Sequence, residues 1–425
     1  MEGLTPLHEA QRIVLDAAKP LGLEKVGLLE GLGRVLGEDV VAERDNPPWD
    51  NSAMGGFAVR WEDIRQEHAI AKPTTLRVIE DVPAGKMATK IVGAGEAIRI
   101  MTGAPLPKGA DTVLKVEDTD NTPESVRVMK PEPRGANIRP QGEDVKKGEC
   151  IIAKGTQIRP GEAGMLAILA RSFFLVYQQP RVAILSSGDE LADLDERFSE
   201  DKIINSNSYG IAAAVKEAGG IPLLLGIARD NPAALKEKIA HGLNADILVL
   251  SGGVSMGDYD FTKAVFKDLG AEMNFWKLAI RPGQPLAFGK IQGKLAFGLP
   301  GNPVSSMVTF EQLVRPAMLK LGGHRSYGRP VVQAVFQEKF SKRTDRRHFL
   351  RGVLTRQDGG FAVRTTGDQG SGILTSMVKA NCLIDVPAEI ERLNPGDLVT
   401  VQMLGGPIHA HDVAGAPPAS WPSCC

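Results

Sequence analysis

The sequence has few cysteines, few aromatic residues and almost no excess of charge of either sign. Only 4 of its 425 residues are cysteine, and their spacing matches neither a metal site nor a disulfide framework. This usage is typical of a reducing compartment, so we expect a cytoplasmic protein. The formal net charge of -1 argues against a nucleic-acid partner, because neutralising phosphates requires an excess of lysine and arginine.

Long hydrophobic runs are also missing. No apolar stretch reaches the roughly 18 residues that a membrane span requires, and the first residues lack the basic and apolar pattern of a secretion signal. We therefore expect neither membrane association nor export. A chain of 425 residues is too long for a single hydrophobic core, which predicts several domains.

The apolar pattern changes its period along the chain. Residues 5–19 have a helical period, with Thr5 as the expected cap and four apolar side chains on one face. Residues 156–178 also read as helical. Short alternating runs separated by glycine or proline, over about 70–155 and again over 326–404, are typical of small β domains.

From residue 181 onward, apolar strands alternate with helices. Expected strands over 181–187, 221–228 and 246–251 are each followed by a helical segment, which predicts a parallel sheet covered on both faces. A hairpin over 286–300 precedes a helix over 302–323. The fold class is therefore multidomain α/β. The predicted regions are a helical linker module (1–45 and 146–179), an inserted β domain (46–145), a doubly wound α/β domain (180–325), a C-terminal β domain (326–404) and a disordered tail (405–425).

Three loops rich in small residues follow strands at one expected edge of the sheet. They are LSSGDEL (185–191), LSGGVSMGDYD (250–260) and GLPGNPVSS (298–306). Small residues at such an edge let backbone N–H groups face an anion. One such loop is ordinary turn chemistry, but three at one edge predict a phosphate-type pocket. The candidate binding residues are Ser187, Gly188, Ser251, Gly252, Gly253, Ser255, Asp258, Pro300, Gly301, Asn302 and Pro303.

Acidic residues accompany these loops. Glu190, Asp230, Asp258 and Asp260 all follow strands that end at the same edge. Each one alone is better explained as a helix cap or a solvated acid. Several acids beside phosphate loops, however, suggest a divalent cation such as Mg²⁺, bound through oxygen.

The segment FWKLAIRPGQP carries two basic residues at a regular spacing. Lys277 and Arg281 are placed to line an anion path, or else to form the solvated basic ends of a surface strand. No Ser–His–Asp or Cys–His arrangement is apparent in the sequence.

The loop motifs LSSGDEL, SGGVSMGDYDFTK and GLPGNPVS, together with DNSAM, RIMTGAP, GEDV, INSNSY, FWKLAIRPGQP and GDQGSG, resemble those of the MoeA/gephyrin E-domain family of molybdopterin molybdenumtransferases. The resemblance covers about residues 5–404. It implies an elongated four-domain protomer that forms a homodimer. It also implies an active site between the MogA-like α/β domain of one subunit and the inserted β domain of the other.

The resemblance also implies a reaction. Adenylylated molybdopterin would bind, molybdate would be inserted at its dithiolene, and AMP would leave in a step that uses Mg²⁺. Transient contacts with the adenylylating enzyme and with cofactor-receiving apoenzymes would follow. The residues implied for molybdate are Lys277, Arg281, Arg347, Arg351 and Ser371. Those implied for catalysis are Glu190, Asp230, Asp260, Thr102 and Asp144, with Glu190 and Asp260 holding the metal and Thr102 and Asp144 reaching in from the partner subunit. Asn51 and Ser52, in the same inserted domain of the partner, would bind substrate.

One position departs from the family pattern. The family commonly has DNSAMDGYAV where this chain has DNSAMGGFAV, so Gly55 occupies the place of an aspartate. Either a neighbouring acid such as Asp50 or Asp144 takes over its role, or turnover is weakened or lost. The alternatives to a molybdate-inserting enzyme are therefore an attenuated relative, a pterin-binding scaffold without turnover, and a variant that inserts tungstate.

Overall fold

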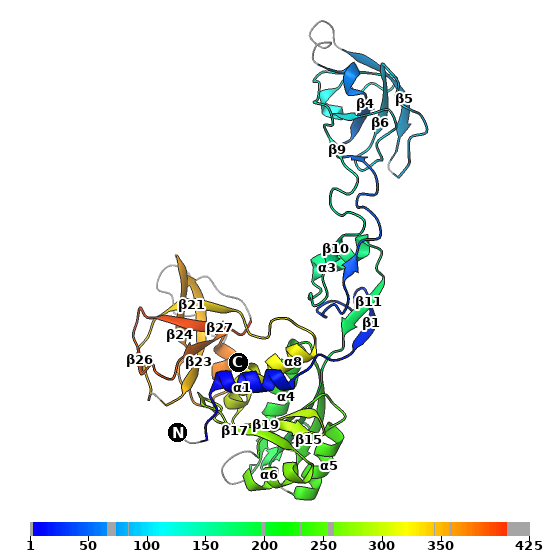
Figure 1. The fold of residues 1–425 in the computed structure, drawn as a ribbon. Coiled ribbons are helices and arrows are strands. Elements are labelled where there is room, and N and C mark those ends of the chain that lie inside the picture. Colours follow the sequence, from blue (N-terminus) through cyan, green and yellow to red (C-terminus); the bar gives the residue numbers. More distant parts are fainter. Residues whose placement is uncertain are drawn as a thin grey trace.

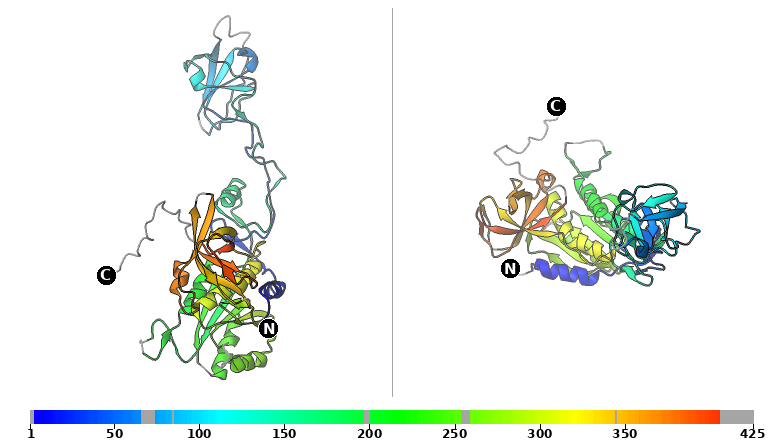
Figure 2. Two further views of the ribbon diagram at one scale, coloured as in Figure 1. Left: turned by 90° about the vertical axis from the view of Figure 1, so that its left-hand side faces the viewer. Right: turned by 90° about the horizontal axis from the view of Figure 1, so that it is seen from above.

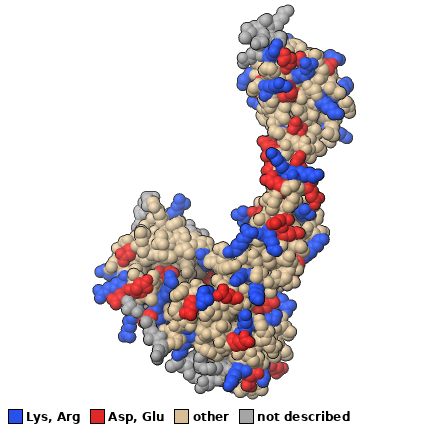
Figure 3. All heavy atoms as spheres, in the orientation of Figure 1, with Lys and Arg blue, Asp and Glu red and all other residues tan. Residues whose placement is uncertain are grey.

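The structure, a computed structural model, describes residues 3–65, 74–83, 85–196, 200–229, 231–253, 259–343, 345–357 and 359–405, with the backbone alone for 259–263. The molecule is elongated (Figures 1 and 2), with the α/β domain and the C-terminal β domain side by side at one end and the inserted β domain at the other. Acidic and basic side chains are interspersed over the face drawn in Figure 3. No helix in the described part of the chain is long and apolar enough to cross a membrane.

The α/β domain is built on a six-stranded sheet. Four neighbouring strands are parallel, and an antiparallel hairpin extends the sheet at one edge. The predicted strands and hairpin are therefore correct. In spatial order the strands are β15 (Ile221–Ala228), β12 (Arg181–Ser187), β16 (Ile247–Ser251), β20 (Lys294–Leu299), β19 (Pro285–Ile291) and β17 (Glu272–Lys277).

Helices cover both faces of this sheet. Along β12, Val182 and Ile184 join one apolar core, whereas Ala183 and Leu185 join the core on the opposite face. A strand buried on both sides favours apolar residues at successive positions, which explains the run Val182–Leu185 in the sequence. The first core is covered by α1 (Leu7–Ala17), α4 (Ser206–Glu217), α7 (Pro303–Thr309), a π-helical segment (Phe310–Val314) and α8 (Arg315–Leu321), and the second by α5 (Pro232–Gly242) and α6 (Tyr259–Asp268).

The first helix differs from the prediction in its cap and in its packing. Pro6 occupies the N-cap position, and no side chain caps the helix. Thr5 instead continues the backbone pairing, since its N–H donates to the Lys277 carbonyl at 2.9 Å. Leu7 and Val14 of α1 lie in the core of the α/β domain, so α1 packs on that domain and not within the linker module.

The linker module contains more strand than predicted. It has one helix, α3 (Pro160–Ile168), so the predicted helix over 156–178 is correct there and wrong over β11. The sequence FFLVY of β11 alternates exposed and buried positions, as a half-buried strand does. The strands pair as β1 (Leu23–Gly27) with β11 (Phe173–Tyr177) and β2 (Val40–Val41) with β10 (Cys150–Ile152).

The inserted domain has a five-stranded sheet with an apolar core on each face. Its strand order is β7 (Thr112–Lys115), β4 (Gly56–Val59), β6 (Glu96–Ile100), β5 (Thr75–Val82) and β8 (Ser125–Arg127). Smaller elements are the pair β3 (Asn51–Ser52) and β9 (Ile138–Arg139) and two 3₁₀ turns, η1 (Trp61–Asp63) and η2 (Val116–Asp118).

The C-terminal domain is a closed barrel, because β23 pairs with both β24 and β25. The short strand β18 (Ile280–Arg281), which belongs to the α/β domain in sequence, adds to β23 in parallel. The barrel strands are β23 (Arg347–Gln357), β24 (Gly360–Thr365), β21 (Val331–Phe336), β27 (Leu398–Met403) and β25 (Cys382–Val386), and the short elements of this domain are β22 (Phe340–Ser341), β26 (Arg392–Leu393) and α9 (Thr375–Lys379). The α/β domain has two further short strands, β13 (Leu191–Ala192) and β14 (Ile203–Ile204), which pair in parallel. The tail predicted to be disordered lies, from residue 406, outside the described residues, and the predicted domain boundaries stay predictions.

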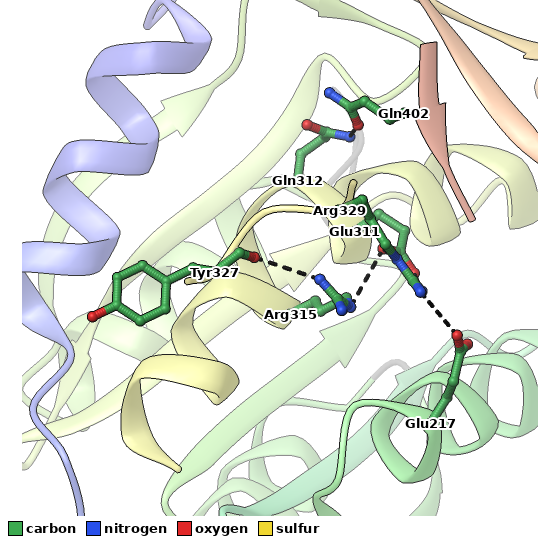
Figure 4. A network of polar contacts seen from close by, with 7 residues as sticks. All are labelled: Glu217, Glu311, Gln312, Arg315, Tyr327, Arg329 and Gln402. Atoms are coloured by element: carbon green, nitrogen blue, oxygen red, sulfur yellow. Dashed lines mark hydrogen bonds and ion pairs between the residues drawn. The ribbon is translucent and has the colours of Figure 1, made fainter. Parts of the chain in front are cut away.

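An ion-pair network centred on Glu311 joins the α/β domain to the segment that leads into the C-terminal barrel (Figure 4). Arg329 donates to both carboxylate oxygens of Glu311, at 2.9 and 2.8 Å, and to Glu217 of α4 at 3.0 Å. The side chains of Arg329 and Glu311 are only 12% and 5% exposed. Beside them, Gln312 donates to Gln402 of β27 at 2.7 Å. The network thus fastens the segment that enters the barrel to the helices of the α/β domain.

We expect Arg329→Met to lower the free energy of unfolding by about 3 kcal/mol, the lower end for a broken buried pair, because the buried Glu311 carboxylate keeps only its longer contact with Arg315, at 3.8 Å. Equilibrium denaturation followed by circular dichroism measures the change. The matched control is Arg12→Met, which breaks an exposed pair whose side chains are 66% accessible and should cost no more than about 0.5 kcal/mol. Equal effects of the two variants would contradict a structural role for the buried pair.

Candidate active site

A pocket of about 630 Å³ lies at the carboxyl ends of β12, β16 and β20. In a parallel sheet all these strand ends meet at one edge, where ligands bind in doubly wound folds. The pocket is therefore where the three loops predicted it. Its lining from the α/β domain includes Ser186, Ser187, Glu190, Leu191, Ile203, Ile204, Asn205, Ser206, Asn207, Ser251, Gly252, Arg281, Pro300, Gly301, Asn302 and Pro303, and its lining from the barrel is Arg346, Gln369, Gly370 and Ser371.

The loop after β16 depends on glycine for its close approach to β12. Gly252 has φ +87°, and a Cβ there would stand 2.7 Å from the Ser187 carbonyl oxygen. Any other residue at this position would have a strained backbone conformation, and its Cβ would clash with the Ser187 carbonyl oxygen. The N–H of Gly252 is used within the fold, since it donates to the Leu299 carbonyl at 3.1 Å. Anion donors must therefore come from other groups, and no hydrogen bond among the described residues uses the N–H of Gly301.

The loop before α7 joins the pocket to the barrel. The Asn302 side chain is at the N-cap position of α7 but makes no capping bond. Its amide instead donates to Ser371 Oγ at 3.1 Å, and the Val304 N–H donates to the Ser371 carbonyl at 3.1 Å. Ser371 is thus held at the wall of the pocket by two contacts across the domain boundary.

A second, strongly basic pocket of about 1030 Å³ adjoins the first. The two share Arg281 and Arg346 as well as Pro282, Gln369 and Gly370. A space lined mainly by cations suits an anion. Its charged lining is Arg281, Lys342, Arg343, Arg346, Arg351 and Arg392, with the acids Asp345, Asp368 and Glu391.

Arg351 is the most buried of these cations, at 1% exposed. Its guanidinium donates to Ser376 Oγ at 3.0 Å and to the Gly370 carbonyl at 3.2 Å. Burial lowers the pKa of Arg351 to about 10, against the opposing attraction of Asp368. The group still carries its charge at neutral pH, so it offers a fixed cation to the basic pocket.

His348 lines the same pocket as a neutral group. Burial is the main cause that lowers the pKa of His348 to about 4, and the nearby charges of Lys342 and Arg281 act in the same direction. Its Nε2 is buried and has no hydrogen-bond partner among the described residues. The uncharged imidazole therefore adds no cation to this wall at neutral pH.

The structure brings most of the predicted binding residues together. Those lining the first pocket are Ser187, Glu190, Ser251, Gly252, Arg281, Pro300, Gly301, Asn302, Pro303 and Ser371; Gly188 and Gly253 are their chain neighbours, and Arg351 lines the basic pocket. The predicted residues Asp230, Ser255 and Asp258 lie outside the described residues, and for Asp260 only the backbone, in α6, is described.

Two predicted basic residues lie in neither pocket. Lys277 ends β17, and its carbonyl accepts the Thr5 N–H. Arg347 is paired with Asp385, since its Nε donates to that carboxylate at 2.6 Å. Its neighbour Arg346 lines both pockets instead. Arg346 lies just before β23 and Arg347 is the first residue of that strand, so the point at which the strand starts decides which of the two arginines lines the pockets.

The four residues expected to act from a partner subunit are in the inserted domain or beside it. That domain and the pocket of the same chain lie at opposite ends of the molecule, separated by the linker module (Figures 1 and 2). Asn51 and Ser52 form β3, where Ser52 Oγ donates to the Met54 carbonyl at 2.5 Å. Thr102 is exposed, and Asp144 accepts a bond from the Asn46 amide at 2.9 Å.

Sequence reasoning missed several pocket residues, above all Asn205 and Asn207. They belong to the INSNSY motif, which carried the family resemblance but no assigned role. The signal was available, because polar residues at the start of a helix that follows a pocket-edge strand are placed to line that pocket. Gln369 and Gly370, in GDQGSG, were missed in the same way.

A metal centre is not apparent from side-chain clusters. Among the described residues, no three histidine, cysteine, aspartate or glutamate side chains converge as metal ligands. Glu190 supplies one carboxylate at the pocket. Mg²⁺ is commonly held by one or two carboxylates together with substrate phosphates and water, so Glu190 fits such a site.

Comparison with known proteins matches most of the described chain. Three family models match in order: "MoeA N-terminal region (domain I and II)" at residues 5–170, "Probable molybdopterin binding domain" at 183–320 and "MoeA C-terminal region (domain IV)" at 333–404. The order of these matches agrees with the order of domains in the structure.

Relatives and solved structures agree with these models. A protein of Haemophilus influenzae named molybdopterin molybdenumtransferase is 36% identical over 390 residues, which is 90% of this chain and 94% of the relative. One of the same name from Nostoc is 36% identical over 387 residues, covering 90% and 88%. The crystal structure of a molybdopterin biosynthesis MoeA protein from Pyrococcus horikoshii superposes with a TM-score of 0.82 at 32% identity, over 95% of this chain and 100% of that one. The chain therefore belongs to the MoeA family of molybdopterin molybdenumtransferases and is a transferase of molybdenum cofactor biosynthesis.

Proposed function

We propose that the chain inserts molybdate into adenylylated molybdopterin, with release of AMP, in the cytoplasm. The observation that carries the proposal is that the pocket at the strand ends and the basic pocket share Arg281 and Arg346 in their linings. A large organic phosphate fits the first space, and a small tetrahedral dianion suits the second. Molybdate and the nucleotide-bearing pterin would then meet where the two spaces join, which supplies the proximity that a transfer reaction needs.

The molybdate would be held by Arg281, Arg351 and Ser371. Arg351 is fixed by its bonds to Ser376 and Gly370, and Ser371 is fixed by Asn302. Groups held in this way do not have to reorganise when the anion binds. In this proposal Arg346 takes the binding role that the sequence predicted for Arg347, because Arg347 forms an ion pair with Asp385.

Mg²⁺ would be held by Glu190 and Asp260 together with the phosphate oxygens of the substrate. When bound, it would neutralise charge that develops as the phosphoanhydride breaks. The Glu190 carboxylate lies so close to Gly188 that a Cβ there would meet it at 2.4 Å. Gly188 thus leaves room for the acid at the edge of the pocket.

The active unit would be a homodimer. Within one chain the inserted domain is far from the pocket (Figure 1), so Asn51, Ser52, Thr102 and Asp144 could act only on the pocket of a second copy. The adenylylating enzyme and the cofactor-receiving apoenzymes would be transient partners. Tungstate, an oxyanion of nearly the same size and charge, would compete with molybdate for the same groups.

A scaffold that binds the pterin without turnover is the second candidate, and Gly55 is the observation that favours it. A Cβ at Gly55 would have Thr102 Oγ1 as its nearest atom, at 4.0 Å. The space beside Thr102 is therefore open at the position where the family commonly has an aspartate.

The purified protein, supplied with adenylylated molybdopterin, molybdate and Mg²⁺, should release AMP. We expect Glu190→Ala and Asp260→Ala each to slow this release at least about tenfold, or 1.4 kcal/mol of barrier, and to weaken pterin binding less, because a metal-holding carboxylate acts mainly in the transition state. The matched control is Glu196→Ala, an acid that pairs with Arg229 at 3.8 Å outside the pocket. Tight binding of the pterin without AMP release by the wild type would favour the scaffold, and normal turnover by both variants would place the metal elsewhere.

Light scattering should give about twice the 45.5 kDa of one chain. Mixing and reassociating Glu190→Ala with Thr102→Ala should restore activity to about a quarter of the wild-type value, because half of the dimers formed would be mixed and each would have one intact site. Sites built within one chain would show no such recovery, and neither would a monomer.

Gly55→Asp should raise the rate of AMP release. Gly55 lacks a positive φ, and its Cβ would point into open space, so the variant should fold with little strain. The two acids that could substitute are already engaged, since Asp50 accepts from the Gln141 N–H at 2.7 Å and Asp144 from Asn46. Gly55→Asn fills the same space without the charge and is the control. A stable Asp variant with unchanged turnover would mean that the site is not missing a carboxylate.

A further inference from the structure

The start of α4 is held against the sheet by a buried polar cluster made of Ser186, Asn205 and Ser208. Ser186 Oγ donates to Asn205 Oδ1 at 2.8 Å, and Asn205 Nδ2 donates to Ser208 Oγ at 3.0 Å. Asn205 Oδ1 also accepts the Ser208 N–H and so caps the helix. All three side chains are buried. The side chains of this cluster bond to one another, and they fix the backbone of Asn207, which lies between Asn205 and Ser208 in the sequence.

That residue, Asn207, ties together three segments of the pocket. Its Nδ2 donates to Ser251 Oγ at 2.9 Å, at the end of β16, and to the Gly301 carbonyl at 2.8 Å, in the loop before α7. A carbonyl oxygen can only accept a hydrogen bond, so the nitrogen of the amide must be the atom that faces Gly301. Both amide hydrogens are thereby used, and the orientation of the side chain is set.

The other amide atom of Asn207 is left without a partner. Oδ1 is an acceptor only, and no hydrogen bond in the described part of the chain reaches it. Asn207 itself lines the pocket. A fixed acceptor at a pocket wall selects a ligand that places a donor at that point, because a ligand without the donor leaves the acceptor desolvated and unpaired.

Two apolar side chains beside Asn207 indicate the shape of that ligand. Ile203 and Ile204, in β14, line the same pocket and are 60% and 37% exposed. Large aliphatic side chains exposed at a pocket wall are suited to cover the face of a flat ring. Together with the neighbouring acceptor they match a heterocycle that carries N–H groups at its edge.

We propose that Asn207 Oδ1 accepts an N–H from the edge of a flat heterocycle that lies against Ile203 and Ile204, and that this contact makes Asn207 a specificity-determining residue. The inference rests on the proposed function, whose substrate contains two such rings, a pterin and an adenine. Both share the chemistry that Asn207 recognises, and separate probes distinguish them.

The test compares the affinities of three probes, metal-free molybdopterin, AMP and molybdate, for the wild type and for Asn207→Leu. Loss of a neutral hydrogen bond should weaken one ring-bearing probe about tenfold and leave molybdate binding unchanged. The probe whose affinity falls contains the ring that donates its N–H to Asn207. Asn207→Ser, with a smaller polar side chain that cannot reach, should give the same result and covers the case in which Leu disturbs folding. The matched control is Asn244→Leu, at an exposed site after α5.

Two outcomes would overturn the inference. Unchanged affinity for both ring-bearing probes would mean that Oδ1 has no role in recognition. An equal loss for all three probes, molybdate included, would mean that Asn207 only holds the loops together. A wild type that binds none of the probes would instead contradict the proposed function, so the two failures are distinguishable.

Discussion

The pairing of β18 with β23 is the contact on which the candidate active site depends. It places Ile280 beside Arg347 and Arg281 beside His348 in parallel register, and so fuses the end of the α/β domain to the barrel through main-chain hydrogen bonds. Phe349 and Leu383 of the barrel then join the apolar core beneath the sheet. Because this junction is set by backbone and core together, the barrel arginines and Ser371 reach the pocket in a fixed position. The ion pairs of Arg329 with Glu311 and Glu217 are a further contact near the start of the barrel.

The sequence predicted most of what depends on local pattern. The apolar strands of the α/β domain and the hairpin at β19 and β20 follow from period and turn chemistry, although the Thr5 cap does not form. It predicted poorly what depends on distant contacts. The run containing β11 is apolar enough for a helix and becomes a strand because β1 offers it a partner. Arg346 and Arg347 cannot be told apart without knowing where β23 starts, and α1 could not be assigned to a domain before its partners were known.

Charge in the pocket region is arranged by burial as much as by residue type. Arg351 keeps its cation in a buried position, where its guanidinium donates hydrogen bonds to Ser376 Oγ and to the Gly370 carbonyl. His348, a few residues away, is held neutral mainly by the same exclusion of water. The basic residues of β23 therefore differ in charge, since Arg351 is a cation and His348 is neutral at neutral pH. The basic pocket therefore has Arg351 fixed in its wall. In the loops of the neighbouring pocket, polar groups such as Ser251 Oγ and the Gly301 carbonyl already take part in hydrogen bonds within the fold.

The inserted domain is attached by two lengths of chain that run side by side, one outgoing and one returning. β1 pairs with β11, and β2 pairs with β10, along this double connection. A single tether can swivel about its bonds, but a paired ribbon resists twisting, so the orientation of the distant domain is carried along the arm. Adding or removing one residue on either length would shift one strand against the other and turn every alternate side chain to the opposite face. Changes in the reach of the arm would therefore have to occur on both lengths at once, in matched steps.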